Sequence, residues 1–158
     1  FLNPVETINN NYLSTLNIIN LCHLRNIPVV YAGSSSFHHG KYLSPYAFSK
    51  RAGENLFELF SRTYQLNCAT TRFYNVYGPK QIESGDYATV IGIFEKQYRE
   101  NQPFTIVGDG NQRRDFTHVK DIANGLYQCG QYLLNRKTRT YYEFELGRGQ
   151  NHSMRSRY

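Results

Sequence analysis

Apolar residues recur at helical spacing through the first part of the chain. The run starts after Asn3-Pro4, a pair typical of a helix start because Asn can cap the helix and Pro suits its first turn. Most of its apolar members lie three or four positions apart: Val5, Ile8, Tyr12, Leu16, Ile19 and Leu24. The pattern predicts one amphipathic helix that leads toward Pro28.

A short run of apolar and β-branched residues follows, Val29-Val30-Tyr31-Ala32. Such a run predicts a strand that is buried on both faces of a parallel sheet. Gly33 and the serines at 34–36 come directly after it. Because open α/β sheets bind their ligands at the carboxyl ends of the strands, these serines are candidate site residues.

A second amphipathic helix is predicted from Ser44-Pro45 to about Tyr64. Proline suits the first helical turn because its missing N–H would have no partner there. Tyr46 and Lys50 lie four residues apart, which places both side chains on one face of this helix. The segment Cys68–Phe73 then predicts a second short strand.

The rest of the chain continues to alternate between strands and helices. Helices are predicted over about 88–100 and 119–134, and strands over 104–107 and 141–146. Taken alone, the segment from Asn75 to Pro79 predicts a turn. The alternation of strands with helices is typical of an α/β fold with a parallel sheet.

Composition narrows the class of protein and its partners. The 158 residues carry a net charge of +6, which suits an anionic ligand such as a diphosphate. The basic residues form no run of the kind that binds nucleic acid, so no nucleic-acid partner is expected. The three cysteines lie far apart, which is typical of small buried residues in a reducing compartment. No membrane span or signal-peptide pattern is evident, so we expect a cytoplasmic protein.

The spacing of Tyr46 and Lys50 matters because of what a tyrosine needs in order to act as a base. A free phenol has a pKa of about 10, and lowering it to about 7 requires roughly 4 kcal/mol in favour of the phenolate. A lysine ammonium one helical turn away supplies part of this, and a bound cation such as an oxidised nicotinamide could supply more. A serine hydroxyl from the strand end can hydrogen-bond the substrate oxygen whose proton the tyrosine removes.

Three segments together resemble a known family: GSSSFHHG followed by SPYAFSKRAGE, then RFYNVYGP, and then VGDGNQRRDFTHVKDI. They are similar to the extended short-chain dehydrogenase/reductase family, and within it to the NAD-dependent nucleotide-sugar epimerases and dehydratases. The resemblance covers about residues 3–154, nearly the whole chain. It implies NAD as cofactor, a nucleotide-diphosphate sugar as substrate, and a homodimer as the full-length enzyme.

The resemblance assigns the catalytic roles residue by residue. Tyr46 and Lys50 match the catalytic pair, which also contacts the cofactor. Ser35 matches the catalytic hydroxyl residue because it lies five positions before Gly40, and Ser36 is the close alternative, expected on the substrate side. The loop between the serine and Tyr46 is much shorter than is usual in the family. The adjacent pair His38-His39 would be a poor metal site without further ligands, so no metal is expected.

Further roles follow from the same resemblance. Asn11 matches an asparagine that lies under the cofactor, and Phe73 matches a residue near the nicotinamide. Asn75 is expected to hydrogen-bond the sugar nucleotide. Arg114 is expected to bind the diphosphate, for which a planar guanidinium is suited, and Asp115 is expected to orient or balance it.

The resemblance also implies a domain organisation. Residues 1–80 correspond to the second half of an NAD-binding Rossmann domain, and residues 81–158 to a substrate-binding region interleaved with the last Rossmann helix and strand. The expected fold is therefore the C-terminal part of a doubly wound parallel sheet with part of a smaller mixed α/β region, in which 151–154 would start another helix. The glycine-rich turn that holds the cofactor pyrophosphate does not occur in the sequence, so we expect a fragment of a longer enzyme.

The positions after the catalytic serine bear on the reaction. In the family, dehydratases carry an Asp-Glu pair directly after that residue, and decarboxylases keep a glutamate two positions after it. Here these positions hold Ser36 and Phe37, which favours epimerisation at C4 of a UDP-sugar through a 4-keto intermediate. A dehydratase, a decarboxylase or a reductase of the same family, and a non-catalytic member that binds NAD or a nucleotide sugar, are the alternatives.

Overall fold

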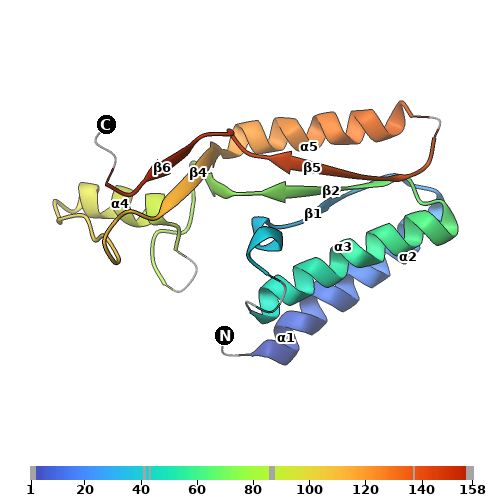
Figure 1. The fold of residues 1–158 in the computed structure, drawn as a ribbon, viewed down its shortest axis with the longest axis horizontal. Helices are drawn as coiled ribbons and strands as arrows, with labels where there is room; N and C mark the ends of the chain where they lie inside the picture. The colour runs from blue at the N-terminus through green and yellow to red at the C-terminus, as the bar shows by residue number, and fades with distance from the viewer. Residues whose placement is uncertain (1–2, 41, 43, 86–87, 137, 156–158) are drawn as a thin grey trace. The chain divides into compact units, whose positions relative to one another are not determined.

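The computed structural model describes residues 3–40, 42, 44–85, 88–136 and 138–155 (Figure 1). The chain forms two compact units, which are described one at a time. Unit 1 comprises Phe1–Phe73 and Asn124–Leu146, and unit 2 comprises Tyr74–Ala123 and Gly147–Tyr158.

A parallel three-stranded sheet forms the centre of unit 1. Its strands are β1 (Val29–Ala32), β2 (Cys68–Phe73) and β5 (Tyr141–Leu146), in the order β1-β2-β5. In the register of the sheet, Cys68 lies opposite both Val29 and Tyr141. The predicted α/β class with a parallel sheet is confirmed.

Helices cover both faces of this sheet. Helices α2 (Ser14–Arg25) and α3 (Pro45–Tyr64) lie side by side on one face, and α5 (Val119–Leu134) lies on the other (Figure 1). The core between the sheet and the helices α2 and α3 consists of Ile19, Leu56, Phe57, Leu66 and Cys68. Successive side chains of β5 point to opposite faces of the sheet, as is usual in a strand. Tyr141 packs against this core, whereas the ring of Tyr142 meets that of Tyr132 of α5 edge-on at 5.1 Å.

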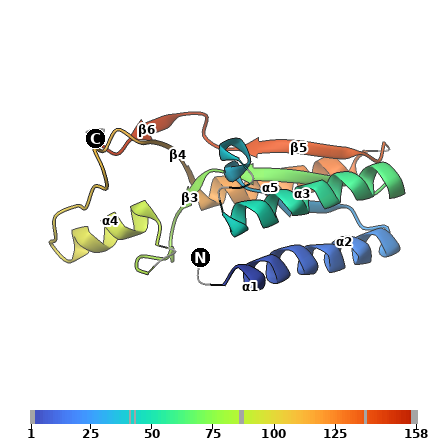
Figure 2. The same cartoon turned by 60° about the horizontal axis from the view of Figure 1, so that its bottom comes forward.

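The N-terminal helical run differs from the single regular helix expected for it. Helix α1 (Pro4–Ile8) passes into a π-helical turn, η1 (Asn9–Leu13), before α2 begins. The three segments form one continuous rod (Figure 2). The hydroxyls of Ser14 and Thr15 donate to the backbone carbonyls of Asn10 and Asn11, four residues earlier. Such side-chain bonds compete for the carbonyls of a regular helix, and the helix widens where they occur.

Helix α3 begins where the sequence predicts. The Oγ of Ser44 accepts a hydrogen bond of 3.0 Å from the backbone N–H of Ala47, and Pro45 occupies the first turn. The helix ends at Tyr64, because Gln65 takes the left-handed conformation with φ of 56°. Tyr46 and Lys50 therefore lie in the first two turns of a helix whose start is fixed by a cap.

Unit 2 is built on a smaller mixed sheet. Strand β4 (Arg113–His118) pairs in parallel with β3 (Asn75–Tyr77) and antiparallel with β6 (Asn151–Ser153). Helix α4 (Val90–Arg99) begins at Thr89, whose Oγ1 accepts a bond of 3.1 Å from the N–H of Gly92.

Three local expectations for unit 2 are wrong. Residues 75–77 form strand β3 rather than part of a turn, and residues 151–153 form strand β6 rather than the start of a helix. No strand forms over 104–107, within the described part of the chain. There the Gln97 side chain bonds both the backbone N–H and the hydroxyl of Thr105, and Phe104 stacks on Phe94 at 5.1 Å. This segment is thus held by contacts with α4 and not by pairing with another strand.

Candidate functional site

The serines that follow β1 form a tight turn at the carboxyl end of the sheet. The backbone N–H of Gly33 donates to the carbonyl of Thr71 at 2.8 Å, and a short 3₁₀ helix, η2 (Ser35–His39), follows. The Oγ of Ser34 accepts bonds from the backbone N–H of Ser36 at 3.2 Å and from its hydroxyl at 3.0 Å. The Ser36 hydroxyl therefore serves the turn itself, and Ser35 is the first residue of η2.

Tyr46 and Lys50 differ in their exposure to solvent. The side chain of Tyr46 is 44% exposed, so its phenol is accessible to a ligand. Lys50 is half-buried, and its Nζ lies 4.8 Å from the centre of the Tyr31 ring. Burial lowers the pKa of Lys50 because it disfavours the ammonium, while the charge of Glu54 acts in the opposite direction.

Tyr31 belongs to the surroundings of this pair, although nothing in its sequence context marked it. Its ring stacks on Phe57 at 4.8 Å, and its hydroxyl lies 3.5 Å from the backbone carbonyl of Lys50. Burial raises the pKa of Tyr31 to about 12; a hydrogen bond with Thr15 opposes the shift, and the charges of Glu54 and Tyr46 add to it. A neutral phenol therefore lies beneath the Lys50 side chain at neutral pH.

Asn11 is connected to the start of α3. Its side-chain amide donates a bond of 3.0 Å to the Oγ of Ser49, and that hydroxyl donates 2.9 Å to the backbone carbonyl of Tyr46. Ser49 is completely buried. Asn11 thus braces the helical turn that carries Tyr46, and its contact with a cofactor stays a prediction.

A buried ion pair lies under the serine turn. Nη2 of Arg72, on β2, bonds Oε2 of Glu54, on α3, at 2.8 Å, and the two side chains are 6% and 3% exposed. Glu143 and Glu145 of β5 also bond this guanidinium. Burial by itself would lower the pKa of Arg72, but the hydrogen bonds that it donates to Glu54 and Glu143 outweigh this effect and raise the pKa.

The glycine between β1 and η2 is packed directly on this ion pair. A Cβ atom at Gly33 would lie 2.7 Å from Oε1 of Glu54 and 2.8 Å from Cγ2 of Thr70. A residue with a side chain could not bring the backbone so close, so Gly33 allows the serine turn to sit against the charged cluster.

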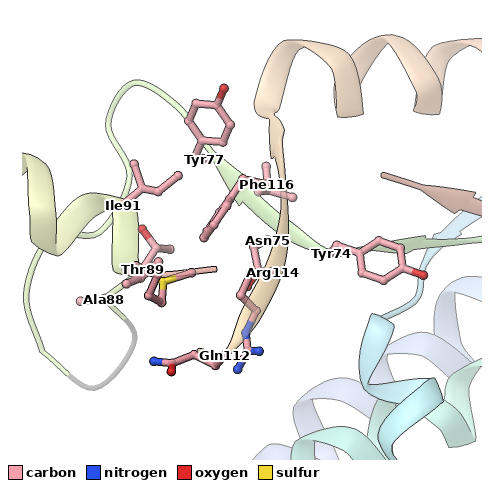
Figure 3. Close-up of a pocket in the computed structure, with 12 residues that line it drawn as sticks. Tyr74, Asn75, Tyr77, Ala88, Thr89, Ile91, Gln112, Arg114 and Phe116 are labelled. Carbon is pink, nitrogen blue, oxygen red and sulfur yellow. The ribbon is translucent and has the colours of Figure 1, made fainter. Parts of the chain in front are cut away.

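A pocket of about 420 Å³ lies within unit 2 (Figure 3). Its lining combines apolar and polar side chains from β3, β4, α4 and the chain near β6: Tyr74, Asn75, Val76, Tyr77, Ala88, Thr89, Val90, Ile91, Gln112, Arg114, Phe116 and Met154. The side chains of Gln112 and Arg114 lie close together on one side of it (Figure 3). An amide and a guanidinium can donate several hydrogen bonds to a phosphate-bearing ligand.

The predicted substrate residues Asn75 and Arg114 both line this pocket. The Asn75 amide donates to the backbone carbonyl of Asp115 at 3.3 Å, which holds β3 against β4. Arg114 is exposed, and its Nη1 donates to the carbonyl of Arg113 at 2.8 Å. The structure thus places the two residues in one unit and around one cavity.

Asp115 has a different partner from the one expected. Its carboxylate accepts bonds from the backbone N–H groups of Arg148 at 3.1 Å and Gly149 at 2.8 Å, and from the hydroxyl of Thr117 at 3.2 Å. It therefore fixes the segment after β5 rather than the side chain of Arg114.

The predicted residues fall into two groups. Ser35, Tyr46, Lys50, Asn11 and Phe73 belong to unit 1, in which η2 packs against α3 and Phe73 ends β2 opposite Leu146. Asn75 and Arg114 belong to unit 2. Within the described residues, no helix is both long and apolar enough to cross a lipid bilayer.

Residues 1–141 match the model of the NAD dependent epimerase/dehydratase family. The chain belongs to this family. Over 94% of its length it is 33% identical to a UDP-glucuronate 4-epimerase of Thermodesulfobacterium geofontis, of which it covers 47%.

Solved structures of family members have the same fold. A UDP-N-acetylglucosamine 4-epimerase from Methanobrevibacter ruminantium, in complex with UDP-N-acetylmuramic acid, superposes with a TM-score of 0.83 at 28% identity over 92% of this chain and 49% of its own. A UDP-glucuronic acid 4-epimerase from Bacillus cereus, with UDP-glucuronic acid and NAD, gives 0.77 at 26% identity over 93% and 48%. The chain thus spans about half the length of these epimerases.

Proposed function

We propose that the full-length protein is an NAD-dependent epimerase that inverts C4 of a UDP-sugar through a 4-keto intermediate. The observation that carries the proposal is the placement of an accessible Tyr46 and a half-buried Lys50 in the first turns of α3, against which the serine turn packs. The three similar proteins described above are named as 4-epimerases of UDP-sugars, which supports the reaction and the substrate class.

Each residue of unit 1 has a defined task in this reaction. Tyr46, as phenolate, removes the proton of the sugar 4-hydroxyl, and Ser35 hydrogen-bonds the same oxygen. Lys50 stabilises the phenolate by its charge, since an ammonium favours a nearby anion. NAD⁺, when bound, supplies the hydride acceptor. The half-buried ammonium of Lys50, with three N–H donors, and the exposed phenolate oxygen of Tyr46, which accepts, are a set that fits the hydroxyl groups of the nicotinamide ribose of this cofactor.

The substrate diphosphate is assigned to unit 2. Arg114 and Gln112 donate to its phosphate oxygens, and Asn75 hydrogen-bonds the nucleotide sugar. The net charge of +6 supports an anionic ligand. Accordingly, we assign NAD binding to the Rossmann-type region and substrate binding to Asn75 and the region that follows residue 80, in a cytoplasmic homodimer of the full-length enzyme.

The residue two positions after Ser35 supports epimerisation over the related eliminations. An elimination of water needs an additional acid and base, whereas Phe37 can supply neither. Its ring lies against the side chains of Arg51 and Arg72, within 3.9 Å of both guanidinium carbons.

The proposal predicts that Tyr46→Phe strongly slows turnover. The full-length protein, supplied with NAD⁺, is incubated with UDP-glucose, UDP-glucuronic acid or UDP-N-acetylglucosamine, and the C4 epimers are separated by chromatography. Loss of the base should lower kcat by about 10²–10⁴-fold. Tyr127→Phe, at a 61% exposed tyrosine of α5, is the matched control and should behave as wild type. Undiminished turnover by Tyr46→Phe, or no conversion of any UDP-sugar by the wild type, contradicts the proposal.

A further inference from the structure

An aromatic side chain in the serine turn lies against two arginines from other elements. The centre of the Phe37 ring lies 3.9 Å from the guanidinium carbon of Arg51 and 3.6 Å from that of Arg72. Arg51 belongs to α3 and Arg72 to β2. Because a cation is attracted to the face of an aromatic ring, above all when water is excluded, Phe37 joins η2 to both elements. We call Phe37, Arg51, Arg72 and Glu54 the Phe37 clamp.

A single buried carboxylate holds both arginines of the clamp. Oε2 of Glu54 accepts from Nη2 of Arg72 at 2.8 Å and from Nη1 of Arg51 at 3.4 Å. The side chain of Glu54 is 3% exposed. The two guanidiniums are therefore held by Glu54 as well as by the ring, which makes the position of Phe37 well defined.

A second contact holds the next residue of the turn. Nε2 of His38 lies 3.1 Å from Oε1 of Glu145 on β5, and the same oxygen accepts from Nη1 of Arg72 at 3.3 Å. The turn, drawn in cyan after β1 in Figure 1, is a 3₁₀ helix of five residues. Such short helices have few hydrogen bonds of their own, so contacts with other elements decide where they lie.

The clamp connects the serine to the helix that carries the tyrosine. Ser35 precedes Phe37 by two residues, and Arg51 directly follows Lys50 on α3. A displacement of Phe37 would therefore move Ser35 relative to Tyr46. We propose that Phe37 is a positioning residue that sets the place of the Ser35 hydroxyl with respect to Tyr46 and Lys50. This inference rests on the proposed 4-epimerase function, because it assigns Ser35 a place in that reaction.

The first test is kinetic and uses the full-length protein with NAD⁺ and the UDP-sugar that it converts best. Phe37→Leu keeps an apolar side chain but removes the ring, and should lower kcat by about 10–100-fold, since misplacement of a reacting group is costly. KM should change by less than about threefold, because ground-state binding is retained. Phe37→Tyr keeps the ring and should restore kcat to within about threefold of wild type. Tyr98→Leu, at a 75% exposed aromatic of α4, is the control.

The second test does not depend on activity. Amide hydrogen exchange of residues 34–39, measured by mass spectrometry, should be faster in Phe37→Leu than in wild type, and unchanged in Phe37→Tyr and Tyr98→Leu. Three results in Phe37→Leu would overturn the proposed positioning role of Phe37: a kcat equal to that of wild type, an effect confined to KM, or unchanged exchange over 34–39. If the wild type converts no UDP-sugar, the proposed function fails and the exchange experiment alone decides whether Phe37 holds the turn.

Discussion

Among individual residues, Arg72 and Glu54 differ most from what a sequence pattern suggests. Arg72 is the next-to-last residue of a strand whose first five residues are buried, and Glu54 lies on the buried side of α3. Charged residues at such positions are normally expected to face solvent. Each is tolerated here because it has partners of opposite charge, and the buried bond between the two is the main one for Glu54.

This pairing predicts a large and specific loss of stability. Arg72→Met leaves Glu54 buried without its main cation, and should lower the free energy of unfolding by about 3–5 kcal/mol. Arg62→Met removes an arginine that pairs with Glu58 on the exposed side of the same helix, where the side chains are 76% and 41% exposed. That change should cost less than about 1 kcal/mol. Urea denaturation of the full-length variants measures both free energies of unfolding. Equal losses in the two variants would contradict the role of Arg72 as the partner of a buried carboxylate.

Residue types and spacing were sufficient to find the candidate catalytic residues but not their surroundings. The four-residue interval between Tyr46 and Lys50 and the serines after β1 are local features, and a local pattern can indicate them. The neighbours Tyr31 and Ser49 were not found, because their contacts depend on how β1, η1 and α3 pack together. The partner of Asp115 was missed for the same reason, since it lies more than thirty residues away in the chain.

At the scale of elements, a side chain of β1 packs closely against the backbone of α3. A Cβ atom at Gly53 of α3 would lie 2.2 Å from the hydroxyl oxygen and 2.7 Å from Cζ of Tyr31. Glycine is therefore required at this point of the helix by packing, although it is a poor helix former.

Two glycine-to-alanine substitutions in helices should consequently change the free energy of unfolding in opposite directions. Gly53→Ala forces the Tyr31 ring to move and should destabilise the full-length protein by about 1–3 kcal/mol. Gly130→Ala in α5 is the matched control, because nothing lies within 4 Å of its Cβ position. There alanine should raise the free energy of unfolding by up to about 1 kcal/mol, through its higher helix propensity. Thermal unfolding followed by circular dichroism distinguishes these outcomes, and a stabilising Gly53→Ala would refute the packing argument.

Elements with a clear apolar pattern were predictable, whereas strands without one were not: β1 was predicted from only four residues, but β4, with six, was not. The periodicity of α3 extends over twenty residues and that of β5 over six, which is enough to show a pattern. Strands β3 and β6 have three residues each, too few to show an alternation. The π turn of η1 was not predictable from apolar spacing, because that spacing carries no information on the bonds that the Ser14 and Thr15 hydroxyls make with backbone carbonyls.

For the molecule as a whole, buried groups that lose a proton at high pH contribute to the loss of stability on the alkaline side. Burial raises the pKa of Tyr31 to about 12 and that of the Cys68 thiol to about 12. In the unfolded chain these groups ionise at about 10 and about 8.5. Between those values and pH 12 the unfolded state binds fewer protons than the folded state, so stability falls as pH rises.

The contribution of these two groups to the free energy of unfolding should therefore be constant below about pH 8.5 and decline progressively toward pH 12. In Tyr31→Phe the ring that stacks on Phe57 is kept and the ionisable hydroxyl is removed. The decline between about pH 10 and 12 should then be less steep than in wild type. Urea midpoints of the full-length protein, measured across this range, test the prediction; identical slopes would show that Tyr31 does not contribute.

The path of the chain between the two units has a consequence for biosynthesis. Both units are made of two separate segments, since the polypeptide leaves unit 1 after Phe73, returns at Asn124 within α5, and leaves again after Leu146. During synthesis on the ribosome, β2 cannot pair with β5, its neighbour in the sheet, until more than sixty further residues have been made. Its free edge is a site for mispairing during that interval, so nascent chains of this protein should rely on chaperones until β5 has emerged.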